Sequence, residues 1–130
     1  MFIESIGVSL VGGNATIRHA RQIMLRSESY DVRAYATCAA LLADPRSRGC
    51  QCIIVHIDMT DGEGTAILRE MRDTGWRGRA ILLDGIKPGN PLIRAAELNG
   101  DKVLERTIPD GPLLAAISAF HPNRTFGTNQ

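Results

Sequence analysis

The residues with the clearest chemical potential follow apolar segments of the chain. His56 ends one such segment, and Asp84 and Arg106 follow two others. The pair Gly12-Gly13 follows the first segment and has no side chain to contribute. An imidazole, a carboxylate and a guanidinium can bind anions, exchange protons or form an internal ion-pair cluster. Which of these they do depends on the elements that position them.

Those elements are expected to alternate between strand and helix. Short apolar segments predict strands, and stretches with Asn, Thr or Pro at their start predict helices. The expected strands are 8–11, 30–35, 53–55, 80–83 and 102–105, and the expected helices begin after Asn14 and cover 38–43, about 66–75, 91–99 and 112–120. This order predicts an α/β fold with a doubly wound parallel sheet. Strand ends share one edge of such a sheet, so we expect the residues named above to lie there.

The first helix also has a predicted buried face. Its apolar side chains recur at helical spacing, which predicts a stripe that packs on the sheet. The stripe is formed by Ile17, Ala20, Ile23 and Met24. Asn14 is expected to cap this helix.

Composition and length limit the possible functions. The chain has 130 residues, 44% hydrophobic and 22% charged, with a net charge of +1. We expect one domain at 1–120, followed by a flexible tail or the start of a linker at 121–130. The charge gives no electrostatic reason to bind nucleic acid or a membrane. No apolar run is long enough to span a bilayer, and the three cysteines favour reduced thiols in the cytoplasm.

The segment from Cys52 to Gly64 resembles the stretch around the phosphoacceptor of the receiver (CheY-like) domains of two-component response regulators. Met59 and Gly64 keep the character of the turn that follows the acceptor, and Leu104-Glu105 keeps that of the last strand. The resemblance extends over about residues 6 to 120. It implies a flavodoxin-like sheet of five parallel strands with five helices.

The same resemblance implies a site for Mg²⁺-assisted phosphoryl transfer, and each of its positions is changed in this chain. The family's acidic pair aligns with Gly12-Gly13, the acceptor aspartate with His56, the Ser/Thr switch with Asp84 and the lysine with Arg106. Mg²⁺ needs hard oxygen ligands, which two glycines cannot supply. We therefore expect no metal, no cofactor and no catalytic residue, and a protein that is not an enzyme.

The interpretation that follows is a degenerate receiver, or pseudo-receiver, that signals without phosphorylation and acts in transcription regulation. In the family, the face formed by the fourth helix, fifth strand and fifth helix commonly mediates dimerisation. The resemblance thus implies a weak homodimer, with Arg94, Glu97, Lys102 and Glu105 as interface candidates. A histidine kinase or other regulator and an effector domain are the partners it implies.

Several alternatives stay open. His56, Asp84 and Arg106 can form an internal cluster, or a neutral His56 can bond to the backbone while the other two are solvated. The domain can instead bind a small anion or nucleotide, or it can transfer phosphate through His56, Asp58 or Asp84. A metal site at Cys50-Gln51-Cys52 and His56 is disfavoured, because strand geometry spreads these residues over about 20 Å.

Overall fold

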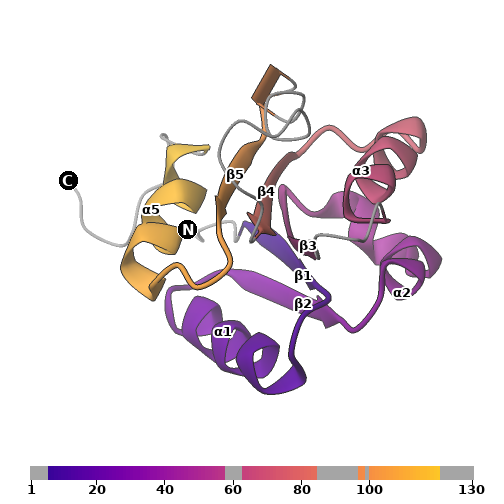
Figure 1. Ribbon diagram of the computed structural model, residues 1–130. Helices are drawn as coiled ribbons and strands as arrows, with labels where there is room; N and C mark the ends of the chain where they lie inside the picture. Colours follow the sequence, from indigo (N-terminus) through magenta and orange to yellow (C-terminus); the bar gives the residue numbers. More distant parts are fainter. Residues whose placement is uncertain (1–5, 58–62, 85–96, 99, 121–130) are drawn as a thin grey trace, which may run out of the picture.

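The computed structural model describes residues 6–57, 63–84, 97–98 and 100–120. Within this part, five parallel strands form one sheet in the order β2-β1-β3-β4-β5 (Figure 1). The strands are β1 Gly7–Val11, β2 Asp31–Tyr35, β3 Cys52–Ile57, β4 Arg79–Asp84 and β5 Lys102–Glu105. The predicted α/β class and parallel sheet are confirmed, and every strand lies where the sequence pattern placed it.

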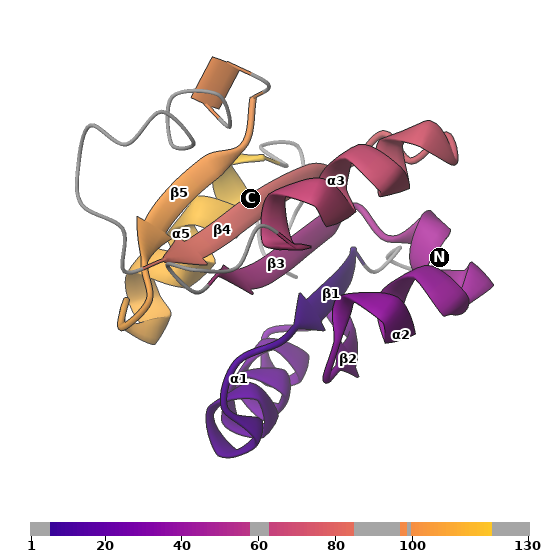
Figure 2. The same cartoon turned by 45° about the vertical axis from the view of Figure 1, so that its right-hand side comes forward.

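Helices cover both faces of this sheet. They are α1 Ala15–Ser27, α2 Cys38–Ala43, α3 Glu63–Asp73 and α5 Asp110–Ala119, with a 3₁₀-helix, η1, at Pro45–Gly49. Helices α1 and α5 lie on one face, and α2 and α3 lie on the other (Figure 2). The helix expected at 91–99 falls outside the described residues except for 97 and 98, so the count of five helices is not confirmed. None of the described helices has the length and apolar character needed to cross a membrane.

Local sequence explains where two helices begin. The Asn14 side chain accepts hydrogen bonds from the backbone N–H groups of Thr16 and Ile17, as the predicted cap requires. Helix α5 begins at Asp110, earlier than the predicted start at Pro112. A proline is tolerated in the first turn because the N–H groups there have no partner within the helix.

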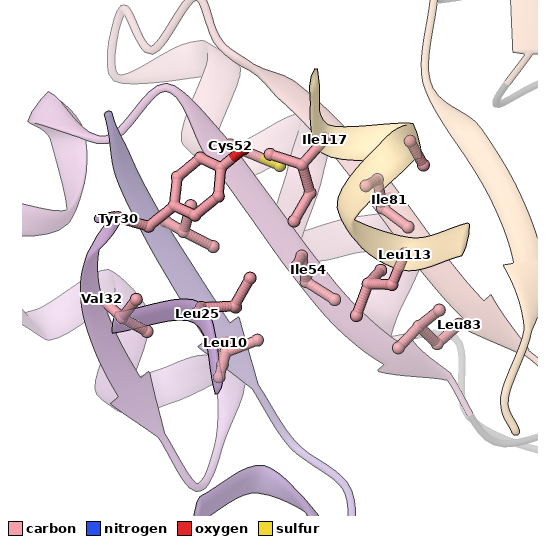
Figure 3. Close-up of a cluster of buried hydrophobic side chains, with 12 residues drawn as sticks. Leu10, Leu25, Tyr30, Val32, Cys52, Ile54, Ile81, Leu83, Leu113 and Ile117 are labelled. Carbon is pink, nitrogen blue, oxygen red and sulfur yellow. The ribbon is translucent and has the colours of Figure 1, made fainter. Parts of the chain in front are cut away.

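The core has one layer on each face of the sheet. Alternate residues of β3 serve the two layers, with Ile53 and Val55 packing beneath α2 and α3. Cys52 and Ile54 pack on the other side, against residues of α1 and α5 such as Leu25 and Leu113 (Figure 3). A strand buried on both faces explains why 53–55 is continuously apolar. The next residue with the same parity as Ile54 is His56, which places its side chain on the α1 side.

The prediction of which α1 residues face the sheet is wrong. The helix is rotated about its axis relative to the expected orientation, so a different face is buried. Ile17 is 48% exposed and Ile23 is 56% exposed, while Arg21 and Leu25 are buried. Arg21 and Leu25 are four residues apart and so share one face of the helix. The sequence pattern excluded Arg21 from this face because an arginine is rarely buried.

Candidate functional site

The turn after β1 brings the backbone close to the end of β3. Gly12 and Gly13 both have positive φ angles, +78° and +76°. A Cβ atom on Gly13 would lie 2.8 Å from Cγ of His56, so only glycine lets the turn approach the imidazole ring this closely. The N–H of Gly12 donates to the carbonyl of Tyr35 at the end of β2, over 2.9 Å. The turn is therefore held between the ends of β2 and β3.

Helix α1 also holds this turn in place through Arg18. Its Nη1 donates to the carbonyl oxygens of both Gly12 and Gly13, each over 3.0 Å. The guanidinium of Arg18 thus satisfies the backbone carbonyls of a turn that contains two residues with left-handed backbone conformation.

His56 is in contact with an arginine that the sequence analysis did not select. Nη1 of Arg21, on α1, lies 2.8 Å from Nε2 of His56. A guanidinium has donors and no acceptor, so Nε2 must accept this hydrogen bond and cannot hold a proton. The neutral imidazole then has its proton on Nδ1. Because its Nε2 lone pair is engaged, that nitrogen is a poor nucleophile in this arrangement.

Arg21 links two strand ends. Its Nη2 donates to the carbonyl oxygen of Arg106, just after β5, over 3.1 Å. Burial lowers the pKa of the Arg21 guanidinium, and the negative charge of Asp110 opposes that effect. The side chain is only 7% exposed. One buried cation therefore bridges the ends of β3 and β5 from the α1 side of the sheet.

A pocket of about 680 Å³ opens at this edge of the sheet. It lies where β1 has β2 on one side and β3 on the other, which is the position where doubly wound sheets usually bind ligands. Its described lining consists of Val11, Gly12, Gly13, Asn14, Ile17, Arg21, Ala36, Thr37, Cys38, His56, Arg106 and Thr107. The described lining contains three basic side chains and no carboxylate, so it suits an anion better than a metal cation.

The predicted site residues are only partly brought together. Gly12, Gly13, His56 and Arg106 all line the pocket. Asp84 ends β4, where its Cα pairs with Ile57 rather than with His56. The side chain of Asp84 lies outside the described part, so the cluster of His56, Asp84 and Arg106 stays a prediction.

No metal centre occurs among the described residues, since no three His, Cys, Asp or Glu side chains there come together. Cys52 packs in the layer beneath α1 and α5, whereas Cys50 packs against the opposite layer. The thiols of Cys52, the first residue of β3, and of Cys50, just before it, thus lie on opposite faces of the sheet. Burial raises the pKa of both thiols, which is typical of structural cysteines.

Sequence reasoning missed Arg18 and Arg21. The available signal was their position in the first two turns of a helix that begins directly beside the Gly12-Gly13 turn. Arg21 also stands four residues from both Ile17 and Leu25, where an amphipathic helix normally has an apolar residue. A charged residue at such a position indicates a buried polar contact.

Of the comparisons with known proteins, the one with solved structures identifies the fold. A scan against known protein families finds no match, and neither does a search of curated protein sequences. Among solved structures, a CheY-like receiver domain from Methylobacillus flagellatus matches with a TM-score of 0.76 and 16% identity, over 91% of this chain and 100% of that one. A CheY-like receiver domain from Methanospirillum hungatei JF-1 matches with a TM-score of 0.75 and 20% identity, over 89% and 93%.

A longer protein with a similar structure is the response regulator DrrB of Thermotoga maritima. It matches 98% of this chain with a TM-score of 0.78 and 17% identity, and the match spans 57% of that protein. Such low identities establish a shared fold and no more. The chain thus has the flavodoxin-like fold of response-regulator receiver domains.

Proposed function

We propose that this chain is a pseudo-receiver, a cytoplasmic signalling and interaction domain that works without phosphorylation and is not an enzyme. The observation that supports this most strongly is the hydrogen bond between Arg21 and His56 beside the Gly12-Gly13 turn. In an active receiver this region holds Mg²⁺ and a phosphorylated aspartate. Here a guanidinium of the chain itself supplies the positive charge, and a neutral imidazole replaces the acceptor.

The arrangement disfavours phosphoryl transfer at each step. The turn offers no carboxylate to Mg²⁺, and a phosphoryl group then lacks its main source of charge neutralisation. Nε2 of His56 would have to lose its hydrogen bond to Arg21 before it could attack a phosphodonor. The stable state of this edge is therefore one in which α1, β3 and the segment after β5 are tied together permanently.

The test is incubation of the protein with acetyl phosphate and Mg²⁺, followed by intact-mass measurement at neutral pH. We expect no added phosphoryl group, and no change of oligomeric state with beryllofluoride. A stable adduct on His56, Asp58 or Asp84 would contradict the proposal. The single change His56→Asp should also fail to create activity, because Gly12 and Gly13 still provide no ligand for the metal.

Binding of Mg²⁺ is best followed by the amide NMR signals of Gly12 and Gly13. Trp76 is a poor fluorescent reporter of this site, because its indole N–H donates to the carbonyl of Cys50, which precedes β3 at the opposite edge of the sheet. We expect no saturable shift at millimolar Mg²⁺. A saturable shift confined to the turn would contradict the loss of the metal site.

We further propose that the domain forms a weak homodimer through the face that includes β5 and α5. Glu97 and Glu105 are exposed there, and Leu98 is 78% exposed. Lys102 is half-buried, and its ammonium lies 5.2 Å from the centre of the Phe120 ring. It therefore already makes a cation–π contact within the chain. Arg94 lies outside the described residues. Exposed ion pairs stabilise by about 1 kcal/mol or less each, which supports only a weak dimer.

The dimer is tested by sedimentation of the wild type and two charge reversals. Glu97→Lys should shift the equilibrium towards monomer, and higher salt should do the same. Glu70→Lys is the matched control, because Glu70 is exposed on α3, on the other side of the sheet. A strict monomer at high concentration, or equal sensitivity to both changes, would refute this choice of face. The partners expected for such a domain are a kinase or other regulator and an effector domain.

A further inference from the structure

The buried guanidinium of Arg21 has no carboxylate partner among the described residues. Arg21 as a whole residue is 7% exposed, and the two hydrogen bonds of its guanidinium go to the neutral acceptors Nε2 of His56 and the carbonyl oxygen of Arg106. Two of its five N–H donors are thus used. Among the described carboxylates, Asp110 raises the pKa of Arg21 through its negative charge, but it forms no ion pair with Arg21. Buried charges in proteins are normally paired with an opposite charge. We therefore expect an anion to bind beside the Arg21 guanidinium.

The surroundings of Arg21 add positive charge. The guanidinium of Arg106 belongs to the same pocket, and Arg18 sits just behind the Gly12-Gly13 turn. The described lining of the pocket contains no Asp or Glu. An anion that enters the pocket therefore meets two cationic residues, Arg21 and Arg106, and no described carboxylate, in a partly desolvated place where charge-assisted hydrogen bonds are strong.

The other side chains in the described lining form an apolar part and a polar part, and the polar part is made by Asn14, Thr37 and Thr107. Ile17 is 48% exposed and forms the apolar part, together with Val11, Ala36 and Cys38. A volume of about 680 Å³ lies in the range of sites for small organic molecules and is far larger than inorganic phosphate needs. An exposed isoleucine next to a buried arginine favours a ligand with one charged end and one apolar end.

We propose that this pocket binds a small organic anion, whose carboxylate or phosphate group pairs with Arg21 and Arg106 and whose apolar part lies against Ile17. The hydrogen bond from Arg21 to His56 fixes the orientation of the guanidinium and leaves its remaining donors for the ligand. This binding is non-covalent, needs no metal and goes beyond the proposed signalling role. It would give a domain that has lost phosphorylation a different chemical input.

The test is an NMR titration of ¹⁵N-labelled protein with phenyl phosphate, benzoate and inorganic phosphate, in EDTA and without a phosphodonor. Saturable shifts are expected at the amides of Gly12 and Gly13. At least one of the two aromatic anions should bind about tenfold or more tightly than inorganic phosphate, and the comparison of the two identifies the preferred charged group. Equal affinity for all three would overturn the apolar part of the proposal. The absence of Mg²⁺ makes the result independent of whether the domain can be phosphorylated.

Variants assign the binding to this pocket. Arg106→Gln, an exposed change that leaves the core intact, should weaken the aromatic anion about tenfold, the usual effect of losing a charged hydrogen bond. Arg26→Gln is the matched control, because Arg26 is also an exposed arginine but lies on α1 and donates to the carbonyl of Val32, away from the pocket. Ile17→Ser should weaken phenyl phosphate and leave inorganic phosphate unchanged. Equal effects of Arg106→Gln and Arg26→Gln would overturn the proposal.

A second negative outcome is equally informative. If no anion gives saturable shifts up to about 10 mM, the pocket is not an anion site. Arg21 would then be neutralised within the chain, and Asp58→Asn and Asp84→Asn would be the first changes to identify the carboxylate responsible.

Discussion

Replacing Gly13 with alanine tests how closely the turn after β1 packs on His56. The new Cβ would lie 2.8 Å from Cγ and 2.9 Å from Cδ2 of the imidazole, well inside the normal contact distance of about 3.5–4.0 Å. Gly13 also has a φ of +76°, which an L-residue adopts only with strain. Two separate costs are therefore expected from a single added methyl group.

The two costs can be estimated separately. The left-handed backbone contributes about 1–2 kcal/mol, and the overlap with the ring contributes about 1–3 kcal/mol. Gly13→Ala should therefore lower the free energy of unfolding by about 2–5 kcal/mol. Gly12→Ala is a matched control, because its φ is +78° but the nearest atom to its Cβ, the carbonyl oxygen of His56, is 3.6 Å away. It should cost only the backbone contribution.

A double-mutant cycle by urea unfolding isolates the contact with the ring. In the His56→Ala background the imidazole is absent, so Gly13→Ala should cost only about 1–2 kcal/mol. A coupling energy of about 1–3 kcal/mol between positions 13 and 56 is the expected result. The packing described for this turn would be refuted if Gly13→Ala and Gly12→Ala had equal costs in the wild type, or if the cost of Gly13→Ala were unchanged without His56.

Three further predictions concern other parts of the molecule. Asp101 is 4% exposed and accepts from Arg72 over 2.7 Å, so Asp101→Ala should lower the free energy of unfolding in urea by about 2–3 kcal/mol; a change under about 0.5 kcal/mol would show that the pair is unimportant. Burial and the hydrogen bond to Asp44 raise the pKa of Tyr35 to about 12. As the pH rises above about 10, the unfolded state loses the phenolic proton of Tyr35 while the folded state keeps it. The free energy of unfolding should therefore fall between about pH 10 and pH 12. Tyr35→Phe should remove that fall, as measured by unfolding at a series of pH values, and an unchanged profile would argue against this cause. The Cys52 thiol is fully buried and burial raises its pKa, so Ellman's reagent should modify it only after unfolding; rapid reaction in the native protein would contradict its place in the core.

The contact between Gly13 and His56 also limits how carboxylates for a metal site could be introduced at this edge of the sheet. An aspartate at position 12 or 13 would have to adopt a left-handed backbone, and at position 13 its Cβ would collide with the imidazole. His56→Asp must therefore come before any acidic pair. Arg21 would then face a carboxylate in place of a neutral nitrogen. Substitutions at positions 12, 13, 21 and 56 would thus be physically coupled rather than independent.

Much of the fold followed from local patterns in the sequence. The run at 53–55 is apolar at every position because β3 is covered on both faces, and this signal survives without knowledge of its neighbours. Asn14 caps the helix that it was expected to cap, and Thr37 caps α2, since a cap depends only on atoms a few residues away. The placement of Gly12, Gly13, His56 and Arg106 at one edge then follows from the rule that parallel strands share their carboxyl ends.

The partner of His56 was decided only by the tertiary structure. The sequence placed His56 at the end of its strand. Whether an arginine or a carboxylate becomes its hydrogen-bond partner depends on which face of the sheet the imidazole occupies and on the rotation of α1. That rotation put Arg21 inward and Ile17 and Ile23 outward, against the simplest apolar pattern. The buried guanidinium is oriented there by His56 and the Arg106 carbonyl, which are distant from it in sequence and accept its hydrogen bonds. Such compensation between distant residues has no local pattern, which is why only the folded chain shows it.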